Sequence, residues 1–165
     1  MSSKIHEFMN WAESNGWKIT QRTNSHLNFD VGFISRYKKI PDGYLDFLRV
    51  VEQCITPDEK TWFLCENEYN NSSDDDFRWN ELELLSLEAA MNDDQWRSEI
   101  TTWWNHYLPI MISVNGGYSF YAIDLSNETG ALVRGDEPEF EEIKKVANDL
   151  DEFLELIMSN SIVFQ

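Results

Sequence analysis

Three apolar runs between residues 110 and 134 constrain the fold more than any other part of this 165-residue chain. They cover residues 110–114, 118–124 and 131–134. Asn-Gly-Gly at 115–117 separates the first two runs, and a polar segment that ends in glycine separates the last two. Glycine and asparagine accept the left-handed backbone conformations of tight hairpin turns. The spacing therefore predicts three consecutive antiparallel strands in a meander.

Helical periodicity is present near both ends of the chain. Apolar residues between positions 5 and 12 recur at helical spacing, and Gly16 follows as a stop signal. A second helix is predicted from about Pro41, which suits the first turn of a helix, to about residue 53. A long C-terminal helix is predicted over residues 140–157, with acidic residues in its first turn.

The middle of the chain predicts a mixture of elements. Residues 61–66 are aromatic and apolar and indicate a strand, and the polar residues 70–76 indicate a loop. The alternating leucines at 82–84 favour a short strand, followed by a helix that Ser86 is placed to cap. Residues 93–107 predict a helix with one wide aromatic face. That face contains Trp96, Ile100, Trp103 and Tyr107.

These elements do not alternate regularly between strand and helix, and no repeat or linker divides the chain. Partial segregation of helices and strands is typical of the α+β class. The sequence therefore predicts one α+β domain over residues 1–165, with a mainly antiparallel sheet flanked by helices.

The net charge of -17 arises entirely from the last hundred residues. Residues 1–65 carry eight acids and eight bases, whereas residues 66–165 carry 22 acids and five bases. Such a field repels nucleic acid and anionic membranes and accelerates encounter with a basic partner. An excess of carboxylates also keeps a protein soluble without any partner, and the charge alone leaves that explanation open.

No motif in the sequence indicates a cofactor, a metal site or catalysis. Cys54 and Cys65 do not form a CxxC pair, and His6, His26 and His106 lie apart from one another. The sequence contains no GxSxG, Walker or GxGxxG pattern. We therefore expect a protein that is not an enzyme, has no cofactor and keeps its thiols reduced. No signal peptide or membrane span is recognised, so we expect a cytoplasmic monomer or weak dimer.

Runs of acidic residues and one tryptophan are the candidate partner contacts. Trp103 and Trp104 point about 100° apart on a helix, so one can fill the core while the other reaches toward solvent. Acidic runs are typical of a solvated face, and here they are also candidates for steering a basic partner. The predicted contact residues are Asp74, Asp75, Asp76, Asp93, Asp94, Trp104, Glu137, Glu139, Glu141 and Glu142.

Six short blocks of sequence occur in an order that resembles the SUKH superfamily. This superfamily comprises bacterial immunity proteins and related eukaryotic cell-wall regulators. The resemblance extends from about residue 37 to residue 159. The blocks are residues 40–48 (IPDGYLDFL), 61–70 (TWFLCENEYN), 79–90 (WNELELLSLEAA), 118–125 (YSFYAIDL), 130–142 (GALVRGDEPEFEE) and 149–157 (DLDEFLELI).

The resemblance implies an α+β fold and a function in protein binding. Its bacterial members bind and neutralise protein toxins used between competing cells, many of which are nucleases. It therefore implies an immunity protein that occludes a cognate, basic, nuclease-type toxin. A regulatory scaffold of the same fold with a non-toxin partner is the alternative, and a small hydrolase is a third, weaker one. The family provides no catalytic motif, and no individual toxin contact is transferred from it.

Overall fold

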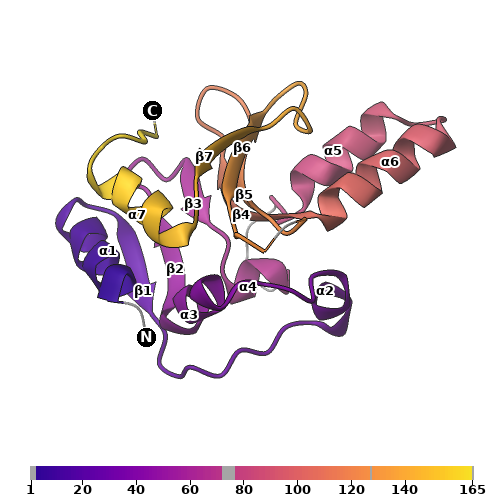
Figure 1. Ribbon diagram of the computed structural model, residues 1–165. Coiled ribbons are helices and arrows are strands. Elements are labelled where there is room, and N and C mark those ends of the chain that lie inside the picture. The colour runs from indigo at the N-terminus through magenta and orange to yellow at the C-terminus, as the bar shows by residue number, and fades with distance from the viewer. Residues whose placement is uncertain (1–2, 72–76, 127, 165) are drawn as a thin grey trace.

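The computed structural model describes residues 3–71, 77–126 and 128–164, and its strands form one antiparallel sheet (Figure 1). The order of the seven strands in the sheet is their order in the chain. The described residues also form seven helices, so the α+β prediction is confirmed. The strands are β1 (Lys18–Gln21), β2 (Val51–Ile55), β3 (Thr61–Phe63), β4 (Tyr107–Ser113), β5 (Ser119–Asp124), β6 (Leu132–Asp136) and β7 (Lys144–Ala147).

The predicted meander is confirmed as β4, β5 and β6. Phe120 of β5 lies opposite Ile112 of β4 and opposite Gly135 of β6. The β4–β5 turn contains Gly116 at φ +73° and Gly117 at φ +127°. A Cβ atom on Gly117 would also lie 2.8 Å from the Oε1 atom of Glu137. Backbone conformation and space therefore both favour glycine in this turn.

Helices cover both faces of the sheet. Phe63 of β3 packs on one face against Phe8, Phe47 and Phe153, which belong to three different helices. Phe120 points to the opposite face and packs there against Trp104. Figure 1 shows α1, α3 and α7 on the first side and α5 and α6 projecting from the second. The helices are α1 (Ser3–Ser14), α2 (Val31–Arg36), α3 (Asp42–Val50), α4 (Glu66–Tyr69), α5 (Glu81–Ala89), α6 (Asp94–Asn105) and α7 (Leu150–Met158).

Three helix and strand predictions in the first two thirds of the chain had wrong boundaries or types. The helix that follows Pro41 ends at Val50, because the next residues enter β2 and pair with β1. The strand at 61–66 ends at Phe63, and the short helix α4 follows it. Leucines at 82–84 belong to α5 and not to a strand.

The predicted helix over residues 140–157 is wrong in its first half. Residues 144–147 form β7, which pairs with β6, and α7 begins only at Leu150. Asp149 caps α7, since its side chain accepts a hydrogen bond from the backbone N–H of Glu152. The acidic residues 137–142 therefore lie in the β6–β7 loop, outside any helix.

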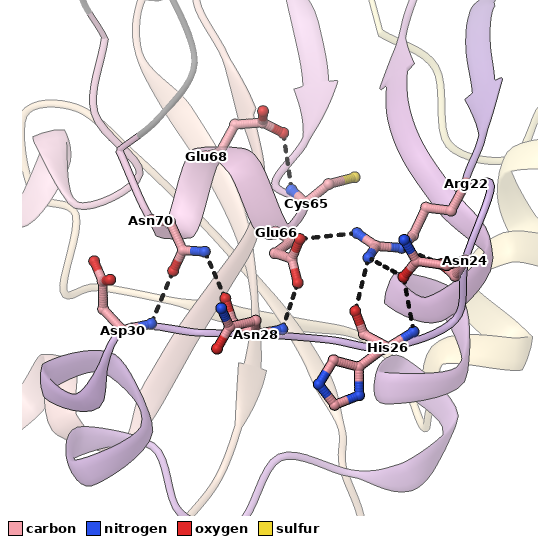
Figure 2. A network of polar contacts seen from close by, with 9 residues as sticks. All are labelled: Arg22, Asn24, His26, Asn28, Asp30, Cys65, Glu66, Glu68 and Asn70. Atoms are coloured by element: carbon pink, nitrogen blue, oxygen red, sulfur yellow. Dashed lines mark hydrogen bonds and ion pairs between the residues drawn. The ribbon is translucent and has the colours of Figure 1, made fainter.

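A segment without regular secondary structure, residues 22–30, leads from β1 to α2 and lies across α4. Figure 2 shows the polar network that holds it there. Arg22 pairs with the carboxylate of Glu66 at 3.0 Å, and the same carboxylate accepts from the backbone N–H of Asn28 at 2.6 Å. Asn70 accepts from the N–H of Asp30 at 2.9 Å and donates to the carbonyl of Asn28 at 2.8 Å. The network sets where α2 begins.

Candidate partner-binding surface

The helices α5 and α6 form an antiparallel hairpin, referred to here as the α5–α6 hairpin, which projects from the sheet (Figure 1). One side of it is apolar and buried against strands β5 and β6. Residues 81–105 contain six acids and one base, which gives the hairpin a net charge of -5. The buried cluster beneath it consists of Leu82, Ala90, Ile100, Trp104, Phe120, Ala122, Val133 and Phe140.

Asp93 and Asp94 lie together at the tip of this hairpin. Asp93 is the N-cap of α6, and its Oδ1 atom accepts from the backbone N–H of Trp96 at 3.0 Å. Asp94 occupies the first turn, where negative charge interacts favourably with the helix dipole. Both residues are exposed. Helix capping therefore explains their place in the fold and leaves their charges accessible to a partner.

The β6–β7 loop contacts the same hairpin. Phe140 is buried in the cluster beneath α5 and α6. Glu141 accepts two hydrogen bonds at its Oε2 atom, from the Ser86 hydroxyl and from the indole N–H of Trp104, both at 2.9 Å. The structure thus brings two of the predicted acidic groups, Asp93 with Asp94 and residues 137–142, to the same side of the sheet.

The four acids of the loop differ in their contacts. Glu137 accepts from the backbone N–H of Tyr118 at 3.0 Å and, like Glu141, is engaged in holding the fold. Glu139 and Glu142 are exposed neighbours. A hydrogen bond that the protonated Glu142 carboxyl donates to Glu139, together with the repulsion between the two carboxylates, raises the pKa of Glu142 above its ordinary value. Glu139 and Glu142 are therefore the loop acids whose charge faces solvent.

The structure corrects the prediction for Trp104. Its side chain is 1% exposed, because it packs against Trp103 and Phe120 with ring centroids 4.9 Å away in each case. Trp104 is a core residue and offers no surface to a partner. Trp103 is only half-buried and stacks on Tyr107 at 4.2 Å. The exposed tryptophan is Trp96, which the helical pattern had placed on the same face as Ile100.

The base of the hairpin is linked to α2. Both terminal nitrogens of the Arg36 guanidinium donate to the Glu83 carboxylate at 2.8 Å, and Arg36 Nε donates to Asn105 at 2.6 Å. Val31 and Ile34 of α2 are exposed. The 22–30 segment, α2 and the hairpin therefore form one connected series of contacts. Asp74, Asp75 and Asp76, the remaining predicted contacts, lie outside the described residues.

A family model identifies the group to which this sequence belongs. The model of the SMI1/KNR4 family (SUKH-1) matches residues 21–156. The chain belongs to the SMI1/KNR4 family (SUKH-1). The match confirms the SUKH resemblance and begins earlier than residue 37, so it includes the 22–30 segment and α2. The family includes toxin immunity proteins together with other members. No significant match was found among curated proteins or among solved structures.

Other features of this SUKH-1 protein bear on its chemistry. In residues 3–71, 77–126 and 128–164, no group of three or more His, Cys, Asp or Glu side chains is arranged to hold a metal ion. None of the helices described is both long enough and apolar enough to cross a bilayer. Cys54 and Cys65 are unpaired and buried, and burial raises the pKa of both thiols. A buried, protonated thiol is a poor nucleophile.

Proposed function

We propose that this SUKH-1 protein is an immunity protein that binds a cognate, basic, nuclease-type bacterial toxin and blocks it by occlusion. The observation that carries the proposal is the position of the exposed acids. Asp93 and Asp94 of the hairpin and Glu139 and Glu142 of the loop lie on one side of the sheet, and Glu141 joins the two elements through its contacts with Ser86 and Trp104.

Charge complementarity supports this partner class. A nuclease binds phosphates with Lys and Arg side chains, so its substrate surface is basic. An acidic protein surface attracts such a surface at long range and can compete with nucleic acid for it. The charge of -5 on residues 81–105 is of the required sign and projects away from the body of the fold (Figure 1).

The proposed mode of action is binding without chemistry. Glu137 and Glu141 accept hydrogen bonds within the fold, and the two thiols are buried and protonated. The exposed acids lie in a loop and at a helix start, on the surface of the protein. Their proposed role is therefore to attract a basic partner by charge. We place the complex in the cytoplasm of the producing cell, where the thiols stay reduced.

The test is to purify this protein with the product of the adjacent open reading frame. We expect a stable 1:1 complex with a Kd in the nanomolar range or below, as for other inhibitory interfaces of standard size. We also expect nuclease activity to fall in proportion to the complex formed. A basic nuclease from an unrelated system serves as the control and should keep its activity. A stable complex in which the partner keeps its activity would instead favour the regulatory scaffold.

A further inference from the structure

Two large apolar side chains remain exposed at the tip of the α5–α6 hairpin. Met91 is 68% exposed and Trp96 is 47% exposed. All seven tryptophans lie within the described residues, and Trp96 is the only one that is exposed. Both side chains line one shallow hollow of about 510 Å³ that Asp93 and Asp94 also line. The tip therefore combines an exposed indole, a flexible thioether and two carboxylates in one concave surface.

Local structure explains why the indole is not covered. The residues of α6 that face the sheet are Ile100 and Trp104, which are both buried. Trp96 precedes Ile100 by one turn and lies near the end of the hairpin that is farthest from the sheet. The nearby residues at the C-terminal end of α5, Ala89 and Ala90, are too small to cover the indole. Within the part of the chain that the structure describes, the Trp96 ring contacts no other aromatic ring.

We propose that this hollow binds an arginine side chain of the partner, with the guanidinium lying on the Trp96 indole and close to the Asp93 and Asp94 carboxylates. The inference rests on the proposed function, since it takes the partner to be the basic protein described above. Trp is the best aromatic acceptor for a cation, and the planar guanidinium stacks on its face. Met91 provides an adaptable apolar wall for the aliphatic part of the side chain.

The charge of the hairpin selects this occupant over others. The only base between residues 81 and 105 is Arg97, whose guanidinium donates to the carbonyl of Leu87. A second copy of the chain would bring two hairpins of charge -5 together, and like charges repel. Nucleic acid and anionic lipid are repelled for the same reason. A basic side chain on a protein surface satisfies both the apolar and the acidic parts of the hollow.

The test uses a short probe rather than the toxin. The ¹⁵N-labelled protein is titrated with acetyl-Gly-Arg-Gly-amide and, separately, with the same peptide containing citrulline, a neutral analogue of arginine. The indole N–H signal of Trp96 is assigned by its loss in Trp96→Phe. We expect this signal to move with the arginine peptide, and about fivefold weaker binding of the citrulline peptide, which loses both the cation–π contact and the charge attraction.

Variants distinguish binding of the peptide in the hollow from its general electrostatic attraction to an acidic protein. Trp96→Leu keeps an apolar side chain, and the double variant Asp93→Ser, Asp94→Asn keeps a helix cap. Each should weaken binding of the arginine peptide several-fold. Asp149→Ser with Asp151→Asn makes the same change at the start of α7 and should have no effect. No movement of Trp96, equal binding of both peptides, or equal loss in the α7 control would each overturn the inference. The nuclease-inhibition assay tests the proposed function separately, and its outcome does not depend on these peptide titrations.

Discussion

Arg36 and Glu83 form a doubly hydrogen-bonded ion pair that joins α2 to α5. Both N–H···O distances are 2.8 Å, and the side chain of Glu83 is only 6% exposed while that of Arg36 is 22% exposed. A bidentate pair fixes direction as well as distance. The base of the hairpin therefore has a defined orientation relative to α2, although the two partners are 47 positions apart in the sequence.

Breaking this pair should destabilise the protein strongly. Glu83→Gln leaves the Arg36 charge partly buried and unpaired, and we expect the free energy of unfolding to fall by about 3 kcal/mol. Urea denaturation measures this loss of unfolding free energy. The double variant Arg36→Met, Glu83→Leu should recover much of the loss, because it removes both charges. The exposed pair of Asp46 and Arg49 is the control, and Asp46→Asn should cost less than ~1 kcal/mol. Equal effects of Glu83→Gln and Asp46→Asn would contradict this account.

Trp104 should affect stability and not partner binding. Trp104→Phe keeps most of the buried apolar surface but removes the indole N–H that donates a hydrogen bond to Glu141. We expect a loss of about 1–2 kcal/mol in unfolding free energy, from the lost hydrogen bond and a small cavity. The rate of association with the partner should stay within error of the wild type in stopped-flow experiments. A large loss of affinity at unchanged stability would restore Trp104 as a contact.

The exposed acids should control the rate of association. Asp93→Ser with Asp94→Asn, and separately Glu139→Gln with Glu142→Gln, should each slow association several-fold at ~20 mM salt, where the Debye length is about 20 Å. The deficit should shrink at ~0.5 M salt, because ions screen long-range attraction. Stability should change little, since exposed carboxylates contribute little to folding. Association rates unchanged at low salt would mean that these acids serve solubility alone.

Asp58 gives a prediction about pH. The Thr56 hydroxyl donates to its Oδ1 atom at 2.7 Å, and this bond, together with the backbone N–H of Lys60, lowers the pKa of Asp58. A carboxyl whose pKa is lower in the folded state stabilises the fold above its unfolded pKa of about 3.9, and this contribution is lost as the pH falls through the folded value.

Comparison with Asp58→Asn isolates that contribution. Wild type should be more stable than Asp58→Asn at pH 6, by less than ~1 kcal/mol because Asp58 is exposed to solvent. The difference should shrink as the pH falls below about 3.9, because Asp58 is protonated first in the unfolded chain and then, at lower pH, in the folded protein. Urea denaturation over a descending series of pH values gives the comparison. A difference that grew on acidification would show that the charge of Asp58 does not stabilise the fold.

The two cysteines should be inert in the folded protein. Cys54 and Cys65 are each about 1% exposed or less, and burial raises the pKa of both thiols. A thiol reagent such as DTNB should not react at pH 8 in native buffer and should label two thiols in urea. The double variant Cys54→Ala, Cys65→Ala should lose stability and keep its partner affinity. Rapid labelling of the native protein would indicate an accessible, activated thiol.

Local chemistry made the central meander predictable. The glycines at 116 and 117 and the segment ending at Gly130 restrict the backbone to tight turns, and strands joined by tight turns pair with each other. The helix ends capped by Asp93 and Asp149 depend on equally local signals. The Asp149 cap and the Glu three residues later were present in the sequence and mark the true start of α7.

Residues whose exposure depends on distant partners could not be assigned in the same way. Ile143 and Ala147 fit a helical pattern with Phe153, yet pairing with β6 places residues 144–147 in a strand. Periodicity also identified an aromatic face on α6 without showing which part of the helix the sheet covers. That part includes Trp104 and leaves out Trp96, because only the sheet-proximal turns of the hairpin contact β5 and β6.

The hairpin has one further property that follows from the order of the strands. β3 and β4 are neighbours in the sheet, with Phe63 opposite Met111. The chain segment that connects them, which includes the hairpin, therefore begins and ends at adjacent positions of the sheet. A segment inserted between neighbouring strands can change its sequence or length without altering which strands pair. The hairpin within this segment is held to the rest of the fold by the buried apolar cluster, by Arg36 with Glu83, and by Glu141 with Ser86 and Trp104. Exposed residues at the tip of the hairpin, such as Asp93, Asp94 and Trp96, can therefore be replaced while the sheet and these contacts stay the same.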